Sequence, residues 1–155
     1  MKYILLSFML FFSACSVKDY AHTNTKIIII KSPKLKFADV GYIRNSNKKV
    51  ELELFVAGNV IEKFTLNHLA CTSDGCMSKS SFNADYLNSS YPDDVLQNIL
   101  LGRAIYGGAN RVQSKSGFTQ HIKNKDVNIF YSVDAQTISF KDKRNKIIFK
   151  IKDTN

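Results

Sequence analysis

The stretch from residue 50 to residue 66 constrains the fold most, because its alternating pattern fits an antiparallel hairpin in one register. With a three-residue loop over 57–59, Glu53 pairs with Lys63, and a shift of one residue would place Glu53 opposite Phe64. In that register one face of the hairpin carries the apolar residues Val50, Leu52, Leu54, Phe64 and Leu66. We therefore predict a hairpin whose apolar face lines a core.

Strand-like alternation recurs on both sides of a central segment with a helical period. The further strands are predicted around residues 27–30, 34–42, 118–123, 127–133, 137–140 and 146–152. Between them, one or two helical turns are predicted around Phe82, capped by Ser80 or Ser81, and a firmer helix from Pro92 to about Leu101. This order predicts an α+β fold: a curved antiparallel sheet or half-barrel of about eight strands, with a helical insert after strand four that covers the concave side.

The first fourteen residues have the pattern of a secretory signal peptide. Lys2 precedes twelve uncharged residues, 3–14, which as a helix reach only about 18 Å, too short for a bilayer core of about 30 Å. Residues 15–25 are polar and lack an apolar period, so they are predicted to form a tether. Residues 26–155 are then a single β-rich domain.

The junction at Cys15 resembles the lipobox of bacterial lipoproteins, since the small residues Ser13 and Ala14 precede the cysteine, with Phe12 where leucine is usual. This resemblance implies that Cys15 is lipidated after cleavage, which anchors the domain to a membrane. The same resemblance implies, from Ser16, the outer membrane, and we expect the domain to face the periplasm. The alternatives are a plain secretory signal followed by an accidental cysteine, or an uncleaved anchor.

The chain is basic, with a formal net charge of +9, so its partner classes include nucleic acid, anionic lipid and acidic polysaccharide. Export makes nucleic acid the least suitable of these, and we expect no nucleic-acid partner. The alternative interpretation is that lysines scattered beside apolar strands serve solubility and protect strand edges.

The two remaining cysteines, Cys71 and Cys76, enclose a four-residue turn and predict a disulfide in an oxidising compartment. The alternative is a zinc site formed by both cysteines with His68 and Asp74, although this spacing matches no familiar zinc motif. We expect no metal and no cofactor.

No catalytic motif is apparent. The chain lacks a Gly-x-Ser-x-Gly elbow, a His-Glu-x-x-His helix and a phosphate-binding Gly-rich loop. His22, His68 and His121 have no catalytic partner nearby in sequence. We therefore predict that the protein is not an enzyme.

Two functional hypotheses remain. The order of elements resembles the lipoprotein carriers LolA and LolB, which hold acyl chains between a curved sheet and helices. This resemblance implies an apolar ligand or lipid partner under the helix, contacting Leu52, Leu54, Leu96, Ile99 and Leu100. Gly107 and Gly108 then serve as a hinge for that lid, or simply as a surface loop.

The alternative is a structural accessory lipoprotein that docks onto an envelope protein assembly. The stretch Phe37–Ile43 and the cysteine-containing segment before Phe82 also resemble short lipoproteins of Campylobacter and Helicobacter relatives. That resemblance implies no particular chemistry.

Overall fold

A computed structural model describes residues 22–47 and 49–154 of the chain. They form one antiparallel sheet of eleven strands, in the order β6-β5-β4-β3-β2-β1-β11-β10-β9-β8-β7. The strands are β1 (His22–Lys31), β2 (Lys36–Asn45), β3 (Val50–Val56), β4 (Asn59–Leu66), β5 (Ala70–Thr72), β6 (Gly75–Met77), β7 (Arg111–Gln113), β8 (Phe118–Lys123), β9 (Asn128–Val133), β10 (Thr137–Asp142) and β11 (Ile147–Asp153).

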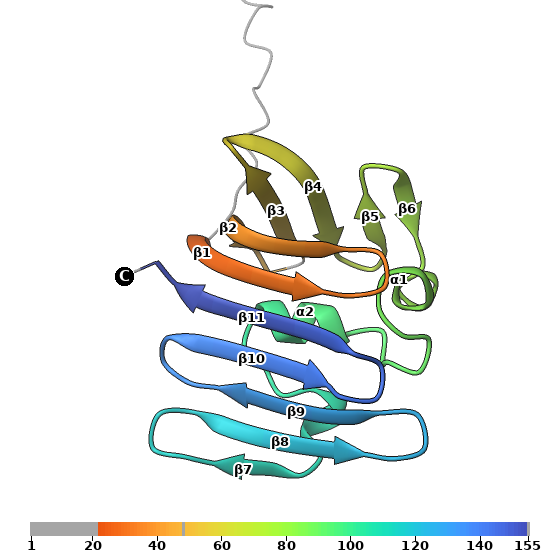
Figure 1. Cartoon of the computed structure of the whole chain (residues 1–155), viewed down its shortest axis with the longest axis vertical. Coiled ribbons are helices and arrows are strands. Elements are labelled where there is room, and N and C mark those ends of the chain that lie inside the picture. The colour runs from red at the N-terminus through yellow and green to blue at the C-terminus, as the bar shows by residue number, and fades with distance from the viewer. Residues whose placement is uncertain (1–21, 48, 155) are drawn as a thin grey trace, which may run out of the picture.

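The helical part is small and lies between the two edges of the sheet. It comprises α1 (Lys79–Tyr86), α2 (Val95–Leu100) and a 3-10 turn, η2 (Tyr106–Gly108). The chain leaves β6 at one edge and enters β7 at the other, so the connecting segment crosses one face of the sheet. Figure 1 shows α2 behind the central strands, and it shows β3 and β4 turned steeply relative to β8 and β9. The helices therefore cover one face of a strongly twisted sheet.

The predicted α+β class with about eight strands and a helical insert after strand four is wrong. The structure is mostly antiparallel sheet, with 52% strand and 13% helix. The additional strands, β5, β6 and β7, have three residues each, and so short a segment shows no period that a sequence pattern can reveal.

The helix predicted over 92–101 is shorter than its pattern suggests. Asn83 donates hydrogen bonds to the carbonyl oxygens of Tyr91 (3.2 Å) and Pro92 (2.9 Å), so these carbonyls are engaged by a side chain before α2 begins. Asp94 occupies the N-cap position without capping the helix through its side chain, and accepts a hydrogen bond from Asn98 at 2.8 Å. Residues 92–95 form a hydrogen-bonded turn, in which the Val95 amide donates to the Pro92 carbonyl at 3.1 Å, and the helix begins only at Val95.

The predicted hairpin is confirmed over most of its length. Glu53 pairs with Lys63 and Leu54 with Glu62, after which the register shifts and Phe55 pairs with Val60. The shift leaves one extra residue in β4 and closes the hairpin on Ala57 and Gly58, which have φ of 50° and 82°. Positive φ at both central positions suits the right-handed twist of the strands, which explains why a tighter turn than the predicted one forms.

The core lies between the sheet and the connecting segment. Alternate strand residues are buried, as in β8, where Phe118, Gln120 and Ile122 face inward. Gln120 is fully bonded, because its side chain donates to the carbonyls of Ile105 and Ala109 and accepts from the Ile105 amide. A polar side chain in the core thereby fixes the segment that leads to β7.

The first strand begins before the expected domain boundary. β1 starts at His22, and residues 22–25, expected in the tether, pair with β2. The predicted signal peptide, Cys15 and the rest of the tether up to residue 21 lie outside the described residues. No helix in residues 22–47 or 49–154 is long and apolar enough to cross a membrane.

Candidate functional site

The residues predicted to contact an apolar ligand lie in a solid core. Leu52, Leu54, Leu96, Ile99 and Leu100 are at most 4% exposed. Two small cavities lie beside Leu96. Each has a volume of about 10 Å³, which is enough for at most one water molecule. The structure therefore brings these residues together, and the cavities beside Leu96 leave no room for an acyl chain. An open pocket of about 280 Å³ borders Leu100 at the end of α2, and His22, Asn24 and Lys26 also line it.

Aromatic side chains seal this part of the core. Phe82 and Tyr86 of α1 stack at 4.6 Å between ring centroids, and both contact Phe64 of β4 edge-on at 5.5 Å. Such a cluster contributes attraction beyond the burial of its area. The helices thus serve to close the core.

The predicted disulfide between Cys71 and Cys76 is present. The two residues are direct partners across the β5–β6 hairpin. Because both thiols are joined, the alternative zinc site loses two of its four proposed ligands, and His68 and Asp74 remain. Within the part of the chain that the structure describes, no group of three or more potential metal ligands occurs.

The opposite face of the sheet is open and carries apolar side chains. Ile27, Ile29 and Val40, which we call the apolar strip, are 37–39% exposed. Ile27 pairs directly with Val40 across β1 and β2, so the strip is continuous. The solvated face of an antiparallel sheet usually carries polar residues. Exposed apolar side chains that lie next to one another on such a face are typical of interaction surfaces.

Farther along the same face, strands β7–β10 form an open hollow of about 550 Å³. Its floor is a row of small side chains: Thr119 of β8 pairs with Ser132 of β9, and Ser132 pairs with Ser139 of β10. The hollow exists because small residues occupy one cross-strand row among larger neighbours. Among the described residues, none of the three hydroxyl groups has a hydrogen-bond partner in the protein.

Larger side chains form one wall of the hollow. In the next row, His121 pairs with Phe130 and Phe130 with Lys141. The His121 ring stacks on Phe130 at 4.0 Å, and the Nζ atom of Lys143 lies 4.5 Å from the Phe130 centroid. His121 is further oriented by Asn128, whose Oδ1 lies 3.2 Å from Nε2. These contacts hold the wall in place without using the hydroxyl groups of the floor.

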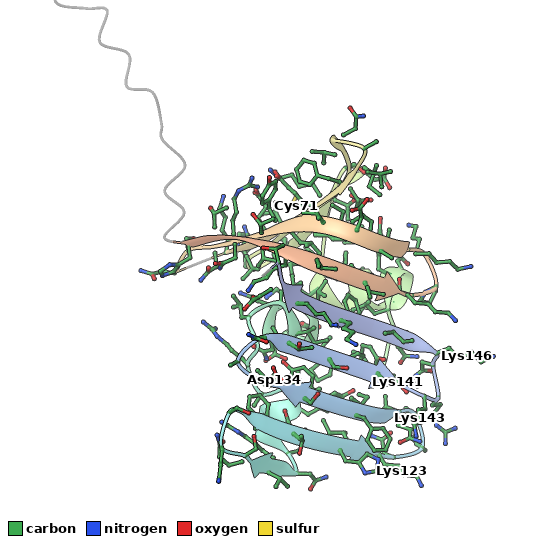
Figure 2. The ribbon with its side chains drawn as sticks, turned by 60° about the vertical axis from the view of Figure 1, so that its left-hand side comes forward. Cys71, Lys123, Asp134, Lys141, Lys143 and Lys146 are labelled. Atoms are coloured by element: carbon green, nitrogen blue, oxygen red, sulfur yellow. A yellow bond between two sulfur atoms is a disulfide. The ribbon has the colours of Figure 1, made fainter. Side chains whose placement is uncertain are left out.

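Positive charge gathers around the hollow. The outward positions of β8–β11 carry the lysines Lys123, Lys141, Lys150 and Lys152 and no carboxylate. None of the four lysines belongs to an ion pair formed within residues 22–47 and 49–154. Figure 2 shows Lys123, Lys141, Lys143 and Lys146 at one end of these strands and Asp134 at the other.

In the middle of β2–β4, by contrast, two cations and two carboxylates neutralise one another. Arg44 Nη1 lies 2.5 Å from Glu53 and 3.2 Å from Glu51, and Lys63 Nζ lies 2.9 Å and 3.0 Å from the same two carboxylates. Burial alone would raise the pKa of Glu53, but the hydrogen bonds from Arg44 and Lys63 outweigh it and lower that pKa. The uncompensated positive charge of the open face therefore lies on β8–β11 and at Lys31 and Lys36, which pair across β1 and β2.

A buried carboxylate supports the turns that carry part of this charge. Asp142 accepts hydrogen bonds from the Tyr91 hydroxyl at 2.8 Å and from the Asn145 side chain at 2.7 Å. Burial tends to raise the pKa of Asp142, but the hydrogen bonds from Asn145, Tyr91 and backbone amides lower it overall. Burial, together with Asp142, raises the pKa of Tyr91, so the pair consists of a neutral phenol and a carboxylate.

The hollow was not predicted from the sequence. Thr119, Ser132 and Ser139 are ordinary polar strand residues, and His121 was set aside as a lone histidine. The signal was the outward alternation of small polar residues in three strands, which becomes a site only when the strand register aligns them.

Comparison with protein-family models, with curated proteins and with solved structures finds no match for this chain.

Proposed function

We propose that this chain is a non-enzymatic, lipid-anchored protein of the cell envelope that docks an envelope protein on the open face of its sheet. The anchor rests on the signal-peptide pattern of residues 1–14 and on the small residues before Cys15. The resemblance at this junction favours the outer membrane.

The observation that carries the docking role is the contrast between the two faces of the sheet. The helix-covered face packs into a core whose cavities beside Leu96 hold at most one water molecule each. The other face leaves the apolar strip open to solvent. A carrier needs an internal apolar cavity, whereas a docking protein needs an exposed apolar patch, so the closed core favours docking.

Docking is tested by placing a photoreactive amino acid at Val40, which pairs with Ile27 within the strip, in cells that export the protein. A matched control carries the same amino acid at Asp85, an exposed position on α1. We expect a discrete crosslinked protein from position 40 and none from position 85. Crosslinks of equal pattern from both positions, or none from position 40, contradict the docking role.

The anchor is tested separately by Cys15→Ser. We expect unprocessed precursor, no incorporation of labelled palmitate and release of any cleaved domain from the membrane fraction, because the acyl chains supply the attachment. The control is the double variant Cys71→Ser, Cys76→Ser, which leaves Cys15 intact and should keep the label. Palmitate incorporation that persists in Cys15→Ser contradicts the anchor.

A further inference from the structure

The hollow on β7–β10 is lined by Val112 and Phe130, which are 65% and 41% exposed, and also by hydroxyl groups, which the apolar strip lacks. Its floor offers the hydroxyl groups of Thr119, Ser132 and Ser139, one from each of three neighbouring strands. Neighbouring strands lie about 4.8 Å apart, so the row repeats at that spacing over about 10 Å. A hydroxyl ladder of this kind suits a ligand that itself repeats hydroxyl groups along an extended chain.

A lysine lies next to the last hydroxyl group of the row. Ser139 pairs with Lys150 of β11, and Lys141 rises from the wall beside the floor. Neither lysine is neutralised by a carboxylate among the described residues. An ammonium group next to neutral hydroxyl donors is complementary to a ligand that carries both carboxylate and hydroxyl groups, because charge-assisted hydrogen bonds are the stronger ones.

The wall argues against stacking of nucleobases. His121 covers Phe130 at 4.0 Å, and Lys143 lies 4.5 Å from the same centroid. A base that stacks on Phe130, which is 41% exposed, therefore competes with His121 and Lys143 for the ring. Sequence-tolerant binding of single-stranded nucleic acid relies on open aromatic faces, whereas the positive edge of a ring favours contact with oxygen atoms.

Shape argues against a flat lipid surface. A flat bilayer surface contacts the groups that protrude from a protein. The hydroxyl groups of the floor lie instead in a depression next to Phe130 and His121, where such a surface does not reach them. The volume of about 550 Å³ lies in the range of clefts that bind ligands of moderate size.

We propose that this hollow binds an acidic polysaccharide, with sugar hydroxyl groups along the row from Thr119 to Ser139 and carboxylates at Lys141 and Lys150. The proposal goes beyond the docking role, because it concerns a different class of partner. The two surfaces adjoin, since Lys150 pairs with Ile29 of the apolar strip.

The test uses the full protein, purified from membranes in a neutral detergent, and measures binding by calorimetry. The probe is hexagalacturonate, and the neutral control ligand is maltohexaose. Ser132→Leu fills the floor and keeps every charge, while Ala38→Leu adds the same side chain at an exposed position of β2 outside the hollow. The double variant Lys141→Gln, Lys150→Gln removes the cations and keeps the floor.

We expect hexagalacturonate to bind, with an affinity that falls as salt rises, and maltohexaose to bind at least about tenfold more weakly, the effect of losing one charge-assisted hydrogen bond. Ser132→Leu and the double lysine variant should each weaken binding by at least about tenfold, and Ala38→Leu should leave it unchanged. If Ser132→Leu does not fold, amide chemical shifts of residues 119, 132 and 139 in the unchanged protein should still respond to the probe.

Three results overturn the proposal: equal affinity for both oligosaccharides, hexagalacturonate binding that Ser132→Leu leaves intact, or binding only to vesicles that contain phosphatidylglycerol. The last result assigns the lysines to a lipid surface. A crosslink at Val40 without oligosaccharide binding rejects this site and leaves the docking role standing, and the reverse pattern rejects docking alone.

Discussion

Replacing the buried carboxylate of Asp142 tests the link between the core and the basic turn beside the hollow. Asp142 is 0% exposed, and its Oδ1 atom accepts from the backbone amides of Asn128 (3.1 Å), Arg144 (2.9 Å) and Asn145 (3.3 Å). Its Oδ2 atom accepts from the Tyr91 hydroxyl and the Asn145 side chain. The carboxylate thus joins β9, the β10–β11 turn and the segment before α2.

In Asp142→Asn the three backbone bonds can persist, but an amide group takes the place of Oδ2 and faces two donors. Two charge-assisted bonds at about 1.5–3 kcal/mol each are then lost, and the Tyr91 hydroxyl recovers part of this by turning to accept. We expect the free energy of unfolding at pH 7 to fall by about 3 kcal/mol. Such a loss is a large share of the stability of one domain.

The same variant should change the acid dependence. Because the folded-state pKa of Asp142 is lowered from its ordinary value of 3.8, its contribution is present above that value and is lost as pH falls through the folded-state pKa. The unchanged protein should therefore lose stability below about pH 4, and Asp142→Asn should lose less over the same window.

The assay is urea unfolding followed by far-ultraviolet circular dichroism at pH 7 and at several values below 4. The control is Asp134→Asn, because Asp134 lies in the preceding turn and accepts only from the backbone amides of Gln136 and Thr137, at 3.0 and 2.9 Å, in an exposed position. That variant should cost less than about 1 kcal/mol. A cost below about 0.5 kcal/mol for Asp142→Asn, or an unchanged acid dependence, refutes the reasoning.

Three further predictions follow from packing. Leu96→Ala and Leu54→Ala should each cost about 2–5 kcal/mol in urea unfolding, because both side chains are in solid core, and fluorescent fatty acid should not bind; binding would restore the carrier hypothesis. Gly41→Ala should lower stability by about 1–3 kcal/mol, because a Cβ there lies 2.8 Å from the backbone oxygen of Glu53; an unchanged urea midpoint argues otherwise. Alkylation of the exported protein should reach the Cys71–Cys76 pair only after reduction, which should cost about 2 kcal/mol; two free thiols without reductant contradict this.

Local patterns were sufficient for the elements whose partners lie nearby in the chain. The pairing of Glu53 with Lys63 followed from alternation and opposite charge within one hairpin, and it was right until the tip, where strand twist selected the tighter turn. The disulfide followed from the short spacing of Cys71 and Cys76. The three-residue strands could not be predicted from the sequence. β7, for example, is too short to show a period and forms by pairing with β8.

The sequence by itself determined the longer strands, the central hairpin and the position of the disulfide, since each depends on residues close together along the chain. The tertiary structure decided which apolar side chains became core. The sequence around Leu96 is the same whether this side chain covers a closed core or a cavity, and only its packing against β3 and β4 distinguishes the two cases. The tertiary structure also created the hollow. Thr119, Ser132 and Ser139 form one row only because of the registers of β8 with β9 and of β9 with β10. Those registers are fixed by the inward-facing residues of the same strands.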